Sequence, residues 1–479
     1  MSCINGKTYL DRINRLHNNV WINGAKITGN LSEHPAFKGV MKSQAMLYDM
    51  QHEKAFQDIL TFKSPSTGDN VGTSYLEPKT KEDLAKRRKS FQVWAHQNVG
   101  MMGRSPDYMN TVVMTFAACA KLFGDKQYTE NMRNFYTHCR ENDLSLTHTF
   151  IQPQVNRSAL YFENASDAIA ARVIEENKDG LVIHGARLLA TQGGMTDELL
   201  VFPTGAFHFD AAYAYAFSIP SNTPGLKFVC RESFDNGKSH YDHPLSSRFE
   251  EVDSVVLFDQ VTVPWDRVFL NGSTDIASRL YTDSSFMPLQ VHQVTSRNII
   301  KTEFILGILQ SLVDAIKVGE YQHIQEKITE VIVTLETLKA LLTASEVHAS
   351  IDQWGTMVPD RKPLMAAMNL FPRTYPRFIE IMQLIGASGL VSIPTEMDFQ
   401  SEIGDELRHY LQSADRDGYE KVKLFRLAWD LSMSSFAGRQ ILYERFFFGD
   451  PVRFATGLYR DYDRSEYVKW VEEFLNRQK

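Results

Sequence analysis

Two stretches of the sequence decide the fold. Residues 254–265 read SVVLFDQVTVPW, and residues 298–319 read NIIKTEFILGILQSLVDAIKVG. The first stretch is short, rich in valine and bounded by a proline, which is typical of a β-strand. The second has apolar residues at every third or fourth position, which is typical of a long helix. The chain therefore passes from a β segment into a helical bundle between them.

The sequence on either side extends this pattern. From Thr8 to about Phe150 the apolar spacing is mostly helical, apart from a hairpin signal at Asn23 and Gly24, where a tight turn needs positive φ angles. Short apolar runs between Gly, Pro, Asn and Asp residues predict a β segment at residues 151–272. We expect an α+β, mostly α protein with an N-terminal helical domain (1–150), a middle β domain (151–277) and a C-terminal helical bundle (278–479). This order does not alternate strands with helices, so it disfavours a doubly wound nucleotide-binding sheet.

Composition excludes several classes of function. The 479 residues have a formal net charge of -7 and no long basic block, so nucleic acid is not an expected partner. The four cysteines are scattered, which argues against a disulfide scaffold and against a cysteine-rich metal site, and we expect no metal. The N-terminus has no apolar signal-peptide core, and no apolar run reaches the ~18 residues of a membrane span. We expect a cytoplasmic protein.

The first candidate site is GMMGRSPDYMN, residues 100–110. Ser105 and Pro106 predict a helix start, because the serine hydroxyl can accept a free backbone N–H and proline has no N–H to leave unpaired. The predicted helix ends at Gly124. Arg104 then lies just before the helix and Tyr108 in its first turn, near the positive end of the helix dipole, where an anionic or phenolic oxygen would bind favourably. The two glycines permit close backbone approach, and the methionines supply apolar surface. The alternative is that Arg104 pairs with a surface carboxylate and Tyr108 only packs.

The second candidate site is LTHTFIQPQVNRS, residues 146–158, at the junction of the helical and β segments. Junctions of this kind often form ligand sites. His148 lies there between two threonines and is followed by a run of polar side chains. The alternative is that His148 is a hydrogen-bonded structural residue.

Five segments together suggest a family: GRSPDYMN, THTFIQPQVNRS, GARLLAT, DHPLSSRFEEVDSVVLFDQVTVPWDRVFL and ILYERFFFGDP. They occur in the same order in the 4-hydroxyphenylacetate 3-hydroxylase family, the oxygenase components of two-component flavin monooxygenases, which the chain resembles over nearly its whole length. The resemblance implies an acyl-CoA dehydrogenase-like fold, usually in a homotetramer. It also implies an enzyme that takes reduced FAD from a separate NAD(P)H-flavin reductase and uses O2 to hydroxylate a para-substituted phenol, such as 4-hydroxyphenylacetate, ortho to its hydroxyl. The product is a catechol.

The same resemblance assigns site residues. Arg104, Tyr108 and His148 would surround the phenolic oxygen, with His148 handling the proton, because its intrinsic pKa is closest to neutrality. Thr204 would contact the substrate tail; here Pro203 precedes it, where relatives have a second small hydroxyl residue. The flavin would contact His148, Thr149, Phe150, Gln154, Val155, Asn156, Arg157, Thr191, Phe448, Gly449, Asp450 and Pro451. A looser match, QLIGASGL at residues 383–390, resembles a flavin-holding segment of acyl-CoA dehydrogenase relatives, with helix termination as the alternative for its glycines.

Other functions remain open at this point. The substrate could be another phenol, such as 4-coumarate, a tyramine-like amine or a chlorophenol. The 4-hydroxybutyryl-CoA dehydratase branch of the fold needs three cysteines and a histidine for an iron–sulfur cluster. His292 matches that histidine, but Arg104 and Tyr108 stand where two cysteines should be. The His-x-x-His spacing of His240 and His243 lacks a third ligand, and we expect it to be structural. A non-catalytic helical scaffold is the alternative from a different class.

Overall fold

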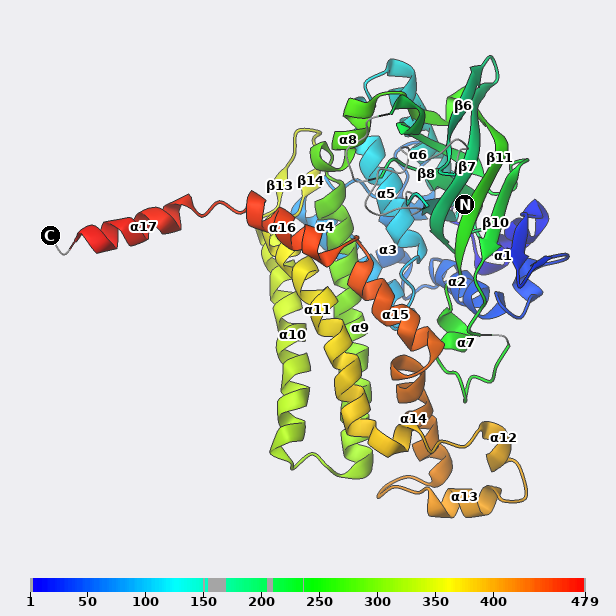
Figure 1. Ribbon diagram of the computed structural model, residues 1–479, viewed down its shortest axis with the longest axis vertical. Helices are drawn as coiled ribbons and strands as arrows, with labels where there is room; N and C mark the ends of the chain where they lie inside the picture. Colours follow the sequence, from blue (N-terminus) through cyan, green and yellow to red (C-terminus); the bar gives the residue numbers. More distant parts are fainter. Residues whose placement is uncertain (1–2, 150, 154–168, 205–209, 236, 478–479) are drawn as a thin grey trace.

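The computed structural model describes residues 3–149, 151–153, 169–204, 210–235 and 237–477. Figure 1 shows a body of helices and sheets beside a tall helical bundle, with the C-terminal helices running off to one side. The helices of the first part of the chain are α1 (Gly6–Leu16), α2 (Lys38–Met50), α3 (Gln57–Leu60), α4 (Lys81–Gln97), α5 (Pro106–Ala118) and α6 (Lys126–Asn142). Helices α4 and α5 both pack on the long bundle helix α9 (Phe286–Ile316), so this part of the chain is joined to the bundle.

The predicted hairpin at Asn23 and Gly24 is confirmed. These residues have φ angles of 51° and 79°, and they connect β1 (Val20–Ile22) to β2 (Ala25–Lys26). The hairpin does not stay among the helices, because β1 pairs in parallel with β10 (Leu226–Cys230). It thereby extends the larger sheet, whose order is β2-β1-β10-β11-β7-β6 and whose other strands are β6 (Arg172–Asn177), β7 (Gly180–Thr191) and β11 (Asp253–Pro264).

The second sheet corrects the expected start of the β segment. It has the order β12-β9-β8-β5, with β5 (Leu146–Thr149), β8 (Glu198–Val201), β9 (Tyr215–Pro220) and β12 (Val268–Asn271). The middle β segment thus begins at Leu146, before the predicted residue 151. All four residues of β5 are buried, and β5 pairs in parallel with β8. Because a strand buried on both faces shows no alternation of apolar and polar residues, its sequence did not look like a strand. The domain boundaries themselves stay a prediction.

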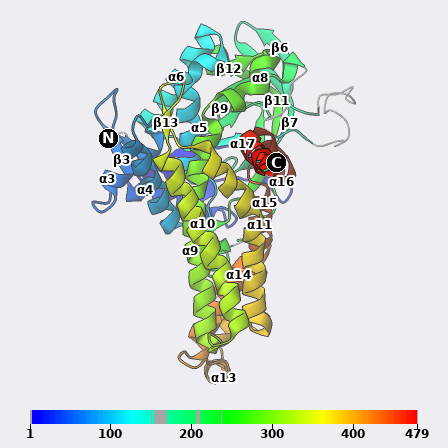
Figure 2. The ribbon, with the colours of Figure 1, turned by 90° about the vertical axis from the view of Figure 1, so that its left-hand side faces the viewer.

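The C-terminal part is helical, as expected. Helices α9, α10 (Gln322–Val347), α11 (Arg361–Gly386) and α14 (Gly418–Ser432) lie side by side in Figure 2 and pack on one another. Their apolar faces form one core that is continuous with the core under the larger sheet. Helix α15 (Ser435–Phe446) packs against α11 and α14 and leads back toward the body.

The remaining elements are short or peripheral: β3 (Thr61–Lys63), β4 (Asn70–Gly72), α7 (Ser246–Phe249), α8 (Thr274–Asp283), β13 (Ser350–Ile351), β14 (Met357–Val358), α12 (Glu396–Phe399), α13 (Gly404–Tyr410), α16 (Pro451–Asp461) and α17 (Ser465–Asn476). Helix α17 projects away from the body in Figure 1, and every residue from 465 to 476 is exposed. Within the described part of the chain, no helix is both long enough and apolar enough to cross a membrane.

Candidate active site

One buried carboxylate holds the loop that contains Arg104. The backbone N–H groups of Gly103 and Arg104 both donate to the two oxygens of Glu251, at 2.8 and 2.6 Å. The side chain of Gln192 donates to the same carboxylate at 3.0 Å. Because charged acceptors form the stronger hydrogen bonds, Glu251 fixes the loop just before α5 begins.

The glycines of this loop do permit close approach, as expected, but the approaching groups belong to the bundle. A Cβ atom on Gly103 would lie 1.7 Å from the Tyr443 hydroxyl oxygen, and one on Gly100, where φ is 71°, would lie 2.6 Å from Cβ of Lys301. Met101 and Met102 are fully buried in the main core. The loop is therefore a junction between the body and helices α9 and α15.

The guanidinium group of Arg104 lies among aromatic rings. Its central carbon is 4.3 Å from the centre of the Tyr108 ring and 4.8 Å from that of Phe447. One terminal nitrogen donates to the Tyr443 hydroxyl at 3.0 Å, whereas Nε has no hydrogen-bond partner among the described residues. Arg104 is 8% exposed. The expected alternative, a surface ion pair, is wrong: the structure buries this cation and leaves it able to bind a further acceptor.

The helix start at Ser105 has the predicted position but not the predicted bond. Pro106 occupies the first position of α5, and Ser105 stands at its N-cap. The Ser105 hydroxyl donates to the carboxylate of Asp107 at 2.6 Å, and so it does not cap a backbone N–H. Helix α5 ends at Ala118, and a 3₁₀ turn (Ala120–Phe123) continues the chain to Gly124.

His148 completes the cluster from β5. Its ring centre lies 5.7 Å from that of Tyr108, and its side chain is buried. Burial, and secondarily the charge of Arg104, hold the pKa of His148 well below its usual value, so the imidazole is neutral. Burial raises the pKa of Tyr108, so its phenol keeps its proton. The structure thus brings together a cation, a neutral imidazole and a protonated phenol.

The two threonines expected near the flavin use their hydroxyls inside the protein. Thr149 donates to the backbone oxygen of Leu188 at 2.6 Å, and Thr191 donates to Asp253 at 2.8 Å. The first bond holds β5 beside β7, and the second holds β7 beside β11. Thr204 is half-buried and lies three residues after the end of β8. Phe150, Gln154, Val155, Asn156 and Arg157 lie outside the described residues.

The segment expected to contact the flavin near the C-terminus is a break between two helices. Helix α15 ends at Phe446, and Asp450 caps α16 by accepting the N–H of Val452. Gly449 has a φ of 110°, which disfavours any other residue. Phe447, just before this turn, reaches the Tyr108 ring at 5.4 Å between centres. The break therefore lies next to the Arg104 cluster.

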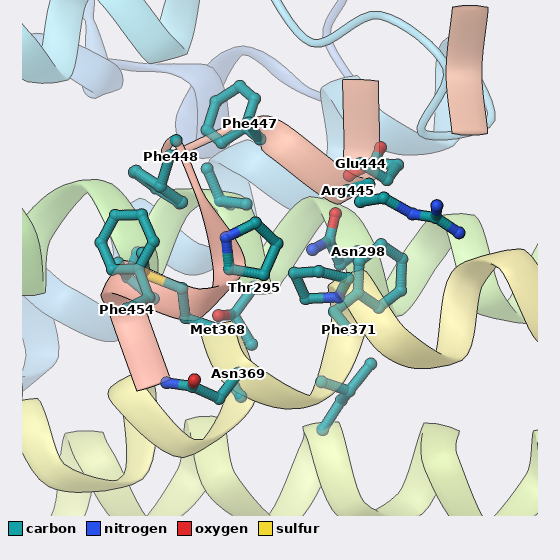
Figure 3. Close-up of a pocket in the computed structure, with 17 residues that line it drawn as sticks. Thr295, Asn298, Met368, Asn369, Phe371, Glu444, Arg445, Phe447, Phe448 and Phe454 are labelled. Carbon is teal, nitrogen blue, oxygen red and sulfur yellow. The ribbon is translucent and has the colours of Figure 1, made fainter. Parts of the chain in front are cut away.

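A small aromatic cavity adjoins this break (Figure 3). Phe447, Phe448 and Phe454 line it from the break and α16, and Met368 and Phe371 line it from α11. Asn298 of α9 also lines it, and its side-chain oxygen is buried without a hydrogen-bond partner among the described residues. The cavity measures about 30 Å³. Since one buried water needs roughly 10–15 Å³, a flavin ring would have to displace these aromatic side chains to enter.

The other histidines that the sequence singled out are held by protein groups. His292 is buried and lies 2.8 Å from a carboxylate oxygen of Glu346. His240 lies 2.7 Å from the Ser247 hydroxyl, and His243 stands edge-on to the Trp429 ring. Within the described ranges, no group of three His, Cys, Asp or Glu side chains is arranged to hold a metal ion.

Sequence reasoning missed three residues that shape the cluster: Glu251, Tyr443 and Phe447. All three occur inside segments that carried the family resemblance, FEEVDS and ILYERFFFGDP. No local pattern distinguishes them, because their partners are more than 140 residues away in the chain.

Comparisons with known proteins identify the family of this chain. The models described as 4-hydroxyphenylacetate 3-hydroxylase N terminal and C terminal match residues 5–270 and 277–476. The chain is 52% identical to the "Probable 4-hydroxyphenylacetate 3-monooxygenase" of Bacillus subtilis (strain 168), over 99% of each chain. It is 44% identical to the "4-hydroxyphenylacetate 3-monooxygenase oxygenase component" of Thermus thermophilus, over 98% of this chain and 97% of that one.

Solved structures show the same fold. A crystal structure of the oxygenase component of 4-hydroxyphenylacetate 3-monooxygenase, complexed with FAD and 4-hydroxyphenylacetate, matches with a TM-score of 0.94, 43% identity and 99% coverage of both chains. An archaeal 4-hydroxybutyryl-CoA dehydratase from N. maritimus is only 19% identical, at a TM-score of 0.89, over 100% of this chain and 95% of that one, and shares the fold alone. The expected α+β, mostly α architecture is confirmed. On sequence and structure together, this chain belongs to the 4-hydroxyphenylacetate 3-hydroxylase family.

Proposed function

We propose that this protein is the oxygenase component of a two-component flavin monooxygenase that converts 4-hydroxyphenylacetate to 3,4-dihydroxyphenylacetate. The family membership supports the reaction, which consumes one phenol, one O2 and one reduced FAD and yields catechol, water and oxidised FAD. The observation that carries the proposal is the buried cluster of Arg104, Tyr108 and His148, which is built to bind an ionising phenol.

The cluster favours phenolate in three ways. A free phenol has a pKa of ~10, and the adjacent Arg104 guanidinium would lower it by favouring the anion. Tyr108, which keeps its proton, can donate a hydrogen bond to the substrate oxygen. His148 is neutral and can accept the phenolic proton. Burial excludes water, which strengthens each of these interactions.

Reduced FAD, when bound, supplies the two electrons with which O2 is activated. The chemistry of the residues near the helix break suits such a ring once the aromatic side chains move to admit it: the lining is aromatic, Gly449 has no side chain to obstruct it, and Asn298 has a buried oxygen without a partner among the described residues. Gln152 is buried, and neither end of its amide has a hydrogen-bond partner among the described residues. We assign Phe448, Gly449, Asp450 and Pro451, together with His148, Thr149 and Thr191, to FAD binding on the family resemblance.

A separate reductase and copies of the same chain are the proposed partners. The name "oxygenase component" of the relatives implies a second component that delivers reduced flavin. Helix α17 exposes six apolar side chains at helical spacing: Tyr467, Val468, Trp470, Val471, Phe474 and Leu475. An isolated helix of 12 residues is marginally stable in water, so this helix needs a surface to pack on. A homotetramer or dimer, located in the cytoplasm, would supply that surface from a neighbouring copy.

One experiment separates the candidate functions. The purified protein is given reduced FAD, O2 and each of a dozen para-substituted phenols, with catalase present so that free hydrogen peroxide does no chemistry. We expect a catechol from 4-hydroxyphenylacetate at the highest kcat/KM. A faster reaction with 4-coumarate or a chlorophenol would change the substrate assignment. No catechol from any phenol would refute the proposal, and bound iron and sulfide would favour the dehydratase.

A further inference from the structure

Arg187 is a buried cation without a counter-charge among the described residues. It lies on β7 and is 0% exposed. Its Nε donates to the Tyr215 hydroxyl at 3.2 Å, and one terminal nitrogen donates to the backbone oxygen of Phe202 at 3.5 Å. In the part of the chain that the structure describes, the other terminal nitrogen, Nη2, has no hydrogen-bond partner, and no carboxylate forms an ion pair with Arg187.

Other buried arginines among the described residues have stronger partners, although Nε of Arg87 and one terminal nitrogen of Arg439 also lack a hydrogen bond. Arg297 pairs with Glu444 at 2.9 Å, and Arg439 pairs with Asp253 at 2.9 Å. Arg87 lacks a carboxylate, but its terminal nitrogens make three hydrogen bonds of 2.7–2.8 Å. Burying a charge without such partners is costly. Among the described residues, Arg187 has neither a carboxylate partner nor hydrogen bonds this short, and like Arg104 it keeps a buried nitrogen that could bind a further acceptor.

The position of Arg187 relates it to the phenol site. Phe202, whose carbonyl it contacts, lies two residues before Thr204, the residue that the family resemblance assigns to the substrate tail. The Tyr281 hydroxyl donates to Pro203 between them at 2.9 Å. Burial chiefly raises the pKa of Tyr281, the ionised form of Tyr108 would raise it further, and the charge of Arg187 lowers it. Tyr281 is thus within electrostatic reach of both the Arg104 cluster and Arg187.

We propose that Arg187 binds the carboxylate of the substrate tail through Nη2. A para-substituted phenol would then lie with its hydroxyl at Arg104 and its tail toward Thr204 and Arg187. Two buried cations at opposite ends of one ligand would select phenols with an anionic tail over neutral or cationic ones. This inference rests on the proposed function and makes it more specific.

The first test compares two substrates of nearly the same shape, 4-hydroxyphenylacetate and its neutral amide, 4-hydroxyphenylacetamide. Loss of a hydrogen bond to a charged group predicts that Arg187→Gln lowers kcat/KM for the acid by about 10–100-fold. The same variant should leave kcat/KM for the amide within about threefold of wild type, and Arg187→Lys should recover part of the preference for the acid. If Arg187 had a purely structural role, the variant would lower kcat/KM for both substrates equally, and that result would overturn the inference.

The matched control is Arg267→Gln. Arg267 also belongs to the middle part of the chain. It pairs with Glu198 at 3.1 Å, so that carboxylate already satisfies its guanidinium. We expect this variant to keep the wild-type ratio of acid to amide. An equal loss of preference in both variants would show that any lost arginine disturbs the tail site, and it would also count against Arg187.

A second test uses the wild-type chain, so it does not depend on how a variant folds. 4-Hydroxyphenylglyoxal is a phenol whose tail carries adjacent carbonyls, and these condense with a guanidinium group. We expect peptide mass spectrometry to find the adduct on Arg187, and 4-hydroxyphenylacetate to protect it. Labelling of other arginines while Arg187 stays unmodified would overturn the inference. If wild type makes no catechol from any phenol, the proposed function itself is refuted. If wild type makes catechol, but Arg187 is not labelled and Arg187→Gln does not change the preference for the acid over the amide, only this inference is refuted.

Discussion

Replacing Gly103 with Ala tests how the loop, the bundle and Arg104 depend on one another. The new Cβ would lie 1.7 Å from the Tyr443 hydroxyl oxygen, whereas ordinary contact begins at 3.4 Å, so the ring must move by about 1.7 Å. That movement would break the 3.0 Å hydrogen bond from Arg104. Overpacking costs about 1–3 kcal/mol and loss of a bond to a charged group about 1.5–3 kcal/mol, so we expect the free energy of unfolding to fall by about 2.5–6 kcal/mol.

The assay is denaturant unfolding followed by tryptophan fluorescence. The denaturant concentration at the unfolding midpoint is compared between wild type and variant, provided that the denaturant dependence of the free energy is the same for both. The control is the same substitution in a Tyr443→Ala background, where the obstructing ring is absent. There Gly103→Ala should cost less than about 1 kcal/mol, because the two sites are in contact and their effects do not add. An equal cost in both backgrounds would refute the steric reasoning.

Three further predictions concern other parts of the chain. Burial raises the pKa of Asp143 to about 6, so between pH 7 and 4 the native state binds a proton that the unfolded chain lacks. The free energy of unfolding of wild type should therefore rise relative to that of Asp143→Asn as the pH falls. A difference between the two that does not change with pH would contradict this. His148→Ala should still oxidise reduced FAD but release hydrogen peroxide in place of catechol, measured with and without catalase; an unchanged catechol yield would remove His148 from the mechanism. Trp470→Ala combined with Phe474→Ala should lower the particle mass measured by light scattering, because both side chains are exposed on α17. An unchanged mass would show that α17 has no role in assembly.

Local features of the fold could be predicted from the sequence. The hairpin at Asn23 and Gly24 and the start of α5 at Pro106 depend on the conformations of one or two residues, which the residue types limit. Arg104 and Tyr108 were found together because they are four residues apart at a helix start. The helical bundle followed from apolar periodicity over long segments.

Features that depend on distant contacts could not be predicted in this way. Strand β5 has no alternating pattern, because both of its faces are buried. The Ser105 hydroxyl bonds the Asp107 carboxylate in place of the expected cap, and the residue types alone do not decide between these two partners. The roles of Glu251 and Arg187 follow from partners that only the folded chain brings near them.

The parallel pairing of β1 with β10 has a consequence for synthesis of the chain. Val20 lies opposite Phe228, about 200 residues later, and ribosomes add roughly 5–20 residues per second. The first strand therefore leaves the ribosome roughly 10–40 s before its partner exists. During that interval its apolar edge is open to other nascent chains, so the yield of native protein should depend on the speed of translation and on chaperones that cover this edge.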